Sequence, residues 1–221
     1  SLRTIYSQEA RKKLRRVLDT FQPNVCHVNN FNYQLTPSIL LEIDLWRKQT
    51  GRKCSVIYTA HDYQLICPNH MLKDIKTNQN CEHCLSKHFY YCTKKCCIHG
   101  SLMKSIIGSL EAYYWNGRNV YRLIDKIVCC SEFMKKKLDY NPVLGDKTVT
   151  LHNFVDCVEW IETEKKDYFI YFGRYSEEKG IRTLLKVCGE LPDVKFVFAC
   201  SGPLESEIIK YPNIQNIGFQ S

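Results

Sequence analysis

The stretch YFIYFGRYSEEKGIRTLL, residues 168–185, decides the fold, because it predicts a strand, a turn bounded by glycines and a helix in that order. Its first residues form a continuous apolar run, which is typical of a strand buried in a parallel sheet. Gly173 follows this run and allows close approach to the backbone, and Gly180 stands where the helix begins. Backbone N–H groups at such a strand-to-helix turn attract anions.

The same alternation of apolar runs and helical periods extends along the chain. We expect strands at 25–28, 54–60, 126–131, 148–153, 168–173, 194–200 and 213–219, and helices at 7–20, 37–49, 101–124, 131–140, 180–190 and 204–210. Apolar strands that alternate with helices indicate parallel sheets covered by helices, so the predicted fold class is α/β. Charged residues break the pattern at 157–167, which predicts a linker between two incomplete units at 1–156 and 168–221.

Composition and charge narrow the class of protein. The 221 residues carry 31 Lys and Arg against 23 Asp and Glu, a net charge of +8, and 44% are hydrophobic, which excludes wholesale disorder. There is no apolar run of ~18 residues to span a membrane and no signal-like apolar segment near residue 1. We therefore expect a cytoplasmic protein whose 13 cysteines are mostly reduced or bound to metal.

The turn between 173 and 180 combines two cations with its glycines. The fork of Arg174 matches phosphate oxygens, and Lys179 supplies a second, compact positive charge. The alternative is a solvated turn in which both side chains form salt bridges with Glu177 and Glu178.

Six cysteines gather in the irregular segment 61–100, which carries little periodicity and needs something to hold it. Cys81 and Cys84 form a C-x2-C hook, and Cys92 and Cys96 form a C-x3-C hook. Thiolates at these spacings can converge on a tetrahedral ion, so we predict a structural zinc on these four, with Cys67 or Cys97 as substitutes. Histidines 70, 83, 88 and 99 are alternative ligands. Free thiols, disulfides or an iron–sulfur cluster are the alternatives to zinc.

Five segments together resemble the family 4 (group 1) glycosyltransferases, a retaining family with the GT-B fold. They are QPNVCHVNNFNYQLTPSIL (22–40), YTAHDYQLICPN (58–69), DKIVCCSEFMKKKL (125–138), TLHNFVD (150–156) and the stretch 168–185. The matches occur at intervals over nearly the whole chain, and the stretch 168–185 is the closest of them.

The resemblance implies two Rossmann-like domains that transfer a sugar, with retention, from a nucleotide-diphosphate donor to a polysaccharide or lipid-linked glycan. By position, Gly173, Arg174, Lys179 and Gly180 would bind the donor diphosphate, Gly202 would lie near the nucleotide, and His61 would contact the transferred sugar. Positive side chains would neutralise the leaving diphosphate, so no catalytic metal is expected. Apart from the resemblance, His61 could simply bond Asp62 or a backbone carbonyl.

The chain also departs from the family pattern. It has neither the family's glycine-rich segment before the first helix nor the later E-x7-E element. We therefore expect an internal fragment, of about 60% of two full domains, with little or no transferase activity of its own.

Basic residues form three patches: 11–16, 94–95 and 135–137. Each can be a solvated face, or a surface that attaches to anionic membrane, which would suit a lipid-linked acceptor. Binding of nucleic acid is the less favoured alternative, and no nucleic-acid partner is expected, because the basic residues are dispersed over several elements. Two other functions stay open, namely a non-catalytic remnant that binds nucleotide and a basic zinc-knuckle module that binds nucleic acid.

Overall fold

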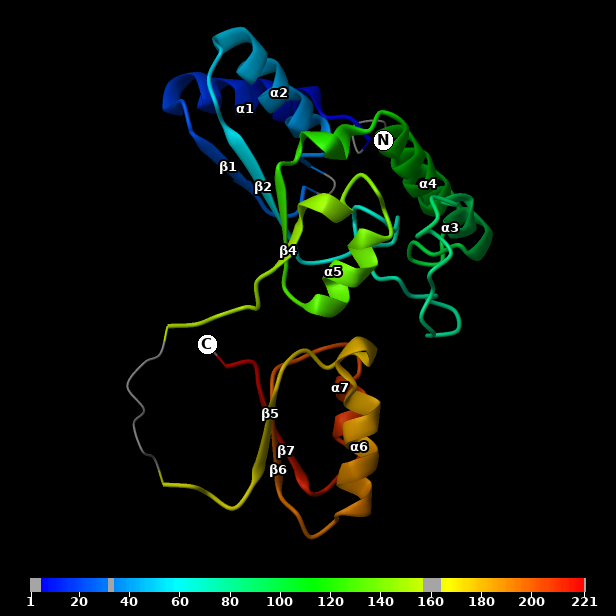
Figure 1. The fold of residues 1–221 in the computed structure, drawn as a ribbon. Coiled ribbons are helices and arrows are strands. Elements are labelled where there is room, and N and C mark those ends of the chain that lie inside the picture. The colour runs from blue at the N-terminus through cyan, green and yellow to red at the C-terminus, as the bar shows by residue number, and fades with distance from the viewer. Residues whose placement is uncertain (1–4, 32–33, 157–163, 221) are drawn as a thin grey trace. The chain divides into compact units, whose positions relative to one another are not determined.

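The structure is a computed structural model that describes residues 5–31, 34–156 and 164–220. The chain divides into two compact units, Ser1–Val155 and Asp156–Ser221, each with its own parallel sheet (Figure 1). Most of the expected linker, 157–163, lies outside the described residues. The fold class is α/β, as the sequence predicted.

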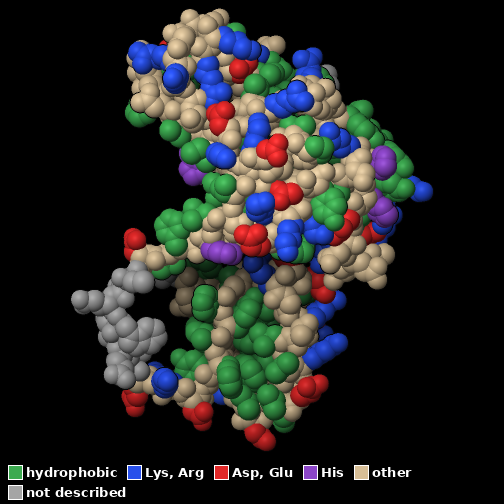
Figure 2. All heavy atoms as spheres, in the orientation of Figure 1, with side chains coloured by type: hydrophobic (Ala, Val, Ile, Leu, Met, Phe, Trp, Pro, Cys, Tyr) green, Lys and Arg blue, Asp and Glu red, His purple; other side chains and the backbone are tan. Residues whose placement is uncertain are grey.

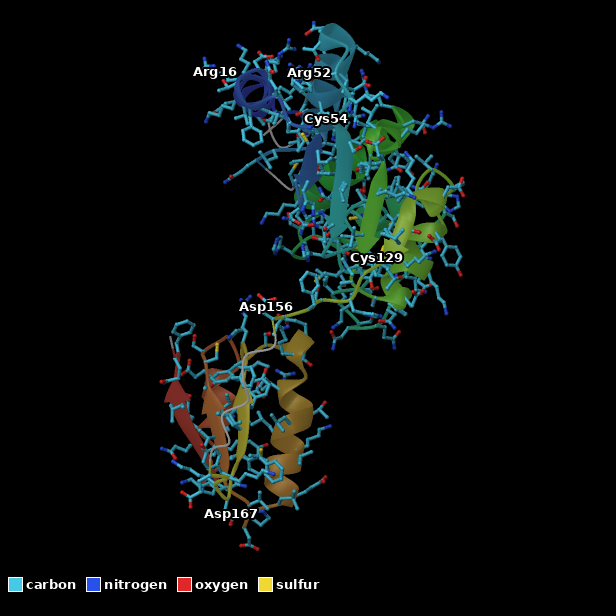
Figure 3. The ribbon with its side chains drawn as sticks, turned by 60° about the vertical axis from the view of Figure 1, so that its left-hand side comes forward. Arg16, Arg52, Cys54, Cys129, Asp156 and Asp167 are labelled. Carbon is cyan, nitrogen blue, oxygen red and sulfur yellow. The ribbon has the colours of Figure 1, made fainter. Side chains whose placement is uncertain are left out.

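The first unit is built on a sheet of parallel strands in the order β1 (Val25–Val28), β2 (Ser55–Ala60), β3 (Lys126–Cys129) and β4 (Thr148–Thr150). The register pairs Ala60 with Cys129 and Cys129 with Thr150. The carboxyl ends of these strands therefore meet at one edge, where ligands bind in open parallel sheets. Figure 3 marks Cys54, just before β2, and Cys129, the last residue of β3.

Four helices flank this sheet: α1 (Gln8–Phe21), α2 (Ser38–Thr50), α4 (Leu102–Gly117) and α5 (Glu132–Asp139). Ser7 and Ser131 cap α1 and α5 through their hydroxyls, which accept from backbone N–H groups three residues on. The long helix predicted at 101–124 is wrong. Asn119 takes a left-handed conformation, with φ 52°, and a separate 3-10 turn follows at Val120–Leu123.

The core of the first unit lies between the sheet and these helices, around Trp46, Tyr58 and Trp115. The segment 61–100 adds Leu65, Ile66, Leu72 and Leu85 to this core. Its only helix among the described residues is α3 (Tyr90–Lys95), which packs on α4. The rest of the segment is irregular and contains one isolated antiparallel bridge, between Lys73 and Asn80.

The second unit holds the parallel strands β5 (Phe169–Phe172), β6 (Phe196–Ala199) and β7 (Ile214–Gly218). Helix α6 (Ile181–Glu190) covers one face of this sheet, and the short α7 (Glu205–Ile208) follows β6 (Figures 1 and 3). Tyr175, Ile181 and Phe198 form its buried core. Figure 2 shows hydrophobic side chains gathered on the surface of this unit, and Phe169, Ile170 and Phe172 of β5 are exposed.

Among the described residues, no helix is both long enough and apolar enough to cross a membrane.

Candidate functional site

The carboxyl edge of the first sheet presents His61, which directly follows β2 and is exposed. In the part of the chain that the structure describes, no hydrogen bond or ion pair joins its ring to another residue. The bond to Asp62 that would give this histidine a purely structural role is therefore not formed. The imidazole is left available to a ligand at this edge.

Asp62 organises a polar network beside His61. Its carboxylate accepts from Asn30 Nδ2 at 3.1 Å and from the backbone N–H of Gln64 at 2.8 Å, and it lies 3.8 Å from His70 Nδ1. Tyr58 donates its hydroxyl proton to Asn30 Oδ1 at 3.2 Å. Burial lowers the pKa of His70, while the charge of Asp62 acts in the opposite direction. The network holds the loops after β1 and β2 together at the carboxyl edge.

The sequence predicted His70 as an alternative metal ligand and did not predict its position beside Asp62. Its position results from a turn in which Tyr63 N–H donates to the His70 carbonyl at 3.0 Å. Such a turn has no period that a sequence would show, so the only available signal was the short distance between Asp62 and His70 along the chain.

The second unit places its charged turn at the carboxyl end of β5. Gly173 donates its N–H to the Ala199 carbonyl, a 3-10 turn covers Glu177–Lys179, and Gly180, with φ 72°, precedes α6. A residue with a side chain would be strained at that φ. The predicted residues Gly173, Arg174, Lys179 and Gly180 therefore share one strand-to-helix turn.

Arg174 and Lys179 are both exposed, and neither forms an ion pair with any residue that the structure describes. Glu177, the expected partner, is 3.3 Å from Arg182 instead, and Arg182 also reaches Glu207 at 2.9 Å. The pKa of Glu178 is lowered, first by the nearby Ser176 hydroxyl and less by the charges of Arg174 and Lys179. The salt-bridged alternative for this turn is therefore not observed.

Gly202 supports this turn from the side of β6. A Cβ at Gly202 would lie 2.5 Å from the carbonyl oxygen of Tyr175 and 2.7 Å from its nitrogen. Tyr175 is fully buried, and its hydroxyl donates to Asn216 Oδ1 at 3.0 Å. Asn216 in turn donates to Glu205 Oε1 at 3.1 Å. Gly202 thus has a packing role, and its contact with a nucleotide stays a prediction.

The structure brings Cys81, Cys84 and Cys92 to one cavity, together with Cys67 and Cys97. Cys96, which completes the predicted C-x3-C hook, does not line this cavity. Its thiol donates to the Thr93 carbonyl at 3.7 Å instead.

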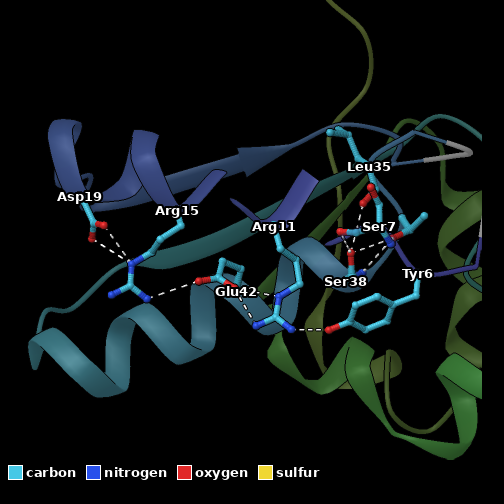
Figure 4. Close-up of polar contacts among 9 residues, drawn as sticks. Tyr6, Ser7, Arg11, Arg15, Asp19, Leu35, Ser38 and Glu42 are labelled. Atoms are coloured by element: carbon cyan, nitrogen blue, oxygen red, sulfur yellow. Dashed lines mark hydrogen bonds and ion pairs between the residues drawn. The ribbon is translucent and has the colours of Figure 1, made fainter. Parts of the chain in front are cut away.

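The basic face of α1 is partly neutralised within the unit. Arg11 and Arg15 both bond the buried carboxylate of Glu42, at 2.7 and 3.3 Å, as Figure 4 shows. Lys12 and Arg16 form no ion pair with a described residue, and both line a groove beside this helix. The cations left for an external anion are therefore fewer than the sequence patch predicted.

No protein-family model matches the sequence, and no curated protein matches it at a significant level. Among solved structures, a mutant of S. aureus TarM in complex with Fondaparinux, alpha-GlcNAc-glycerol and UDP aligns with a TM-score of 0.52 at 12% identity, over 93% of this chain and 36% of that one. HepE of Anabaena in complex with UDP-glucose aligns with a TM-score of 0.52 at 14% identity, over 96% and 52%.

The lipopolysaccharide outer core galactosyltransferase WaaB aligns at 0.48 and 11% identity, over 96% and 48%. The alignments with TarM and HepE show the fold, namely α/β units with parallel sheets as in the GT-B architecture. The chain spans about half or less of the length of these structures.

Proposed function

We propose that the chain is part of a retaining GT-B glycosyltransferase of family 4. It would transfer a sugar from a uridine-diphosphate donor to a polysaccharide or lipid-linked glycan. The sequence resemblance supports the family, and the fold shared with HepE, solved with UDP-glucose, supports the nucleotide.

The observation that carries this proposal is the unpaired state of Arg174 and Lys179 at the turn after β5. Two exposed cations beside a strand end, which form no ion pair with a described residue, suit a ligand with two adjacent phosphates. In the reaction they would stabilise the negative charge that develops on the departing diphosphate. Because these side chains supply the positive charge, the proposed transfer needs no catalytic metal.

The exposed ring of His61 would contact the transferred sugar, since it is free at the carboxyl edge of the first sheet. The network of Asp62, Asn30 and His70 would fix the loops on which an acceptor rests. A lipid-linked acceptor would bring the enzyme to an anionic membrane surface, where Lys12 and Arg16 of α1 are the cations available. The free thiols of the described cysteines support a cytoplasmic location.

The test is the binding of UDP to the purified chain, followed by calorimetry and by NMR shifts. Binding is measured rather than turnover because the chain spans about half or less of the solved structures. Arg174→Ala and Lys179→Ala should each weaken UDP about tenfold or more, since each removes a charged hydrogen-bond donor. Affinity should be the same with and without Mg²⁺.

Arg182→Ala is the matched control, because Arg182 is an exposed arginine on the neighbouring helix that is already bonded to Glu177 and Glu207. It should leave UDP affinity within about twofold. Equal losses in Arg174→Ala and Arg182→Ala would mean that general charge, rather than this turn, attracts the nucleotide. Tight UDP binding by Arg174→Ala and Lys179→Ala would contradict the assignment of the diphosphate site.

A further inference from the structure

The segment 61–100 encloses a small cavity lined with sulfur. Cys67, Cys81, Cys84, Cys92 and Cys97 surround it, and it measures about 10 Å³, close to the smallest space that holds one water or a bound ion. These residues come from widely separated positions in the loop, so the folded segment rather than local spacing collects them.

We propose that this cavity is a structural zinc site whose ligands are the four buried cysteines, Cys67, Cys84, Cys92 and Cys97. Cys81 is only half buried and would remain a free thiol at the rim. The site is independent of the proposed glycosyl transfer, because the zinc holds the loop and takes no part in the chemistry.

The backbone around Cys67 is fixed by a turn. Its N–H donates to the Tyr63 carbonyl at 2.8 Å, and its carbonyl accepts from the His70 N–H at 3.0 Å. Bonds that hold a metal ligand in place in this way orient it toward the ion. Lys73 lines the same cavity and supplies a positive charge beside the sulfurs, whereas the ammonium of Lys95 is bound to Asp74 at 2.8 Å.

Two of the thiols now bond other groups. The Cys67 thiol donates to Asn69 Oδ1 at 2.9 Å, and the Cys84 thiol donates to the His88 carbonyl at 3.9 Å. No three His, Cys, Asp or Glu side chains of the described residues form a ready set of metal ligands. Zinc binding therefore requires the four thiols to turn about their Cα–Cβ bonds toward one centre. Each then gives its proton to solvent as its sulfur bonds to Zn²⁺, with no change of oxidation state.

The first measurement is the zinc content of the whole chain, purified without oxygen or chelator. We expect about one zinc per chain. Substituting cobalt into the same protein should give the visible bands of a tetrahedral cobalt ion with thiolate ligands. These two results need no variant, so they stay decisive even if the substitutions unfold the loop.

The second measurement compares single serine variants. Cys67→Ser, Cys84→Ser, Cys92→Ser and Cys97→Ser should each reduce zinc to below about 0.2 per chain. Cys96→Ser is the matched control, since Cys96 adjoins Cys97 but its thiol faces the Thr93 carbonyl. It should keep its zinc, and so should Cys81→Ser.

Four results would overturn the proposal. The first is wild-type protein with less than about 0.2 zinc and all its thiols reactive. The second is protein that contains iron and sulfide, and the third is metal-free protein with disulfides at these positions. The fourth is loss of zinc in Cys96→Ser while Cys97→Ser retains it, which would leave zinc in the loop but reject this cavity as its site.

Discussion

Gly202→Ala should distort the turn at residues 173–180 of the second unit without changing any charged residue. The added Cβ would lie 2.5–2.8 Å from three backbone atoms of Tyr175, whereas ordinary contact begins at 3.4 Å. The two segments must therefore separate by about 0.9 Å, which is 3.4 less 2.5 Å. Because the atoms in contact belong to the backbone, no rotation of a side chain can relieve the clash.

That separation would stretch the hydrogen bonds that now join the segments. Tyr175 N–H donates to the Ser201 carbonyl at 3.1 Å, and Leu204 N–H donates to the Tyr175 carbonyl at 3.0 Å. Losing two buried backbone bonds, at about 1 kcal/mol each, together with overpacking should destabilise the second unit by about 2–3 kcal/mol. Arg174 precedes Tyr175 directly, so the affinity for UDP should fall as well.

Denaturant unfolding of the second unit, with Tyr175 as a local probe, measures the first effect, and UDP titration measures the second. Gly117→Ala is the control, since a Cβ there meets nothing within 4 Å and α4 ends at that residue. It should be neutral or stabilising by up to about 1 kcal/mol. If Gly202→Ala unfolds within about 0.5 kcal/mol of wild type and binds UDP equally well, the close packing does not hold the turn.

Three further predictions concern the first unit. Burial raises the pKa of Glu111 from 4.5 to about 7, so the stability that its protonated form contributes is complete below pH 4.5 and is lost as pH rises to 7. The free energy of unfolding should fall by about 3 kcal/mol across that window in the wild type, and Glu111→Gln should abolish this fall. The same pH dependence in the variant and the wild type would refute the assignment. Glu42→Ala should lower the free energy of unfolding by about 2 kcal/mol, because it leaves Arg11 and Arg15 without their buried partner. Lys13→Ala, which breaks an exposed pair, should change it by no more than about 0.5 kcal/mol, and equal losses in the two variants would argue against the buried pair. The double variant Lys12→Glu/Arg16→Glu should weaken sedimentation with phosphatidylserine vesicles roughly thirtyfold, and equal binding to neutral vesicles would exclude an electrostatic attachment.

The strands of the sheets could be predicted from the sequence because each coincides with a short run of apolar residues. The run at 25–28 is the strand β1 residue for residue, and 54–60 gives β2 to within one residue. Burial is less complete than these runs suggest, since Val25 of β1 and Phe169 and Phe172 of β5 are exposed. The carboxyl edge that carries His61 follows directly from this alternation.

The interruption after α4 could not be predicted in the same way. Apolar residues continue at Val120 and Tyr121 as they would in a helix, and both side chains are buried. Only the left-handed conformation of Asn119 separates the 3-10 turn from the helix. Asparagine tolerates that conformation, but its sequence signal is weak beside a persisting apolar period.

The sequence also could not predict which side chains interact with one another. Sequence spacing suggested Glu177 as an ion-pair partner of Arg174 and Lys179. In the structure, Glu177 instead forms an ion pair with Arg182 of α6. Spacing also favoured Cys96, but α3 ends there in a left-handed conformation, with φ 51°. That conformation turns the thiol of Cys96 toward the preceding carbonyls and brings Cys97 to the cavity. For the cysteines, a local backbone rotation therefore decides which of two adjacent residues reaches the cavity.

The proposed zinc site and the edge of the first sheet share one turn of the chain. Cys67 N–H donates to the Tyr63 carbonyl at 2.8 Å, and Tyr63 N–H donates to the His70 carbonyl at 3.0 Å. This turn sets His70 against Asp62, next to His61. A metal that fixes the sulfur of Cys67 would therefore also fix the polar network at the carboxyl edge. An irregular loop of this length is otherwise a poor support for such a network, because little regular hydrogen bonding resists its motion.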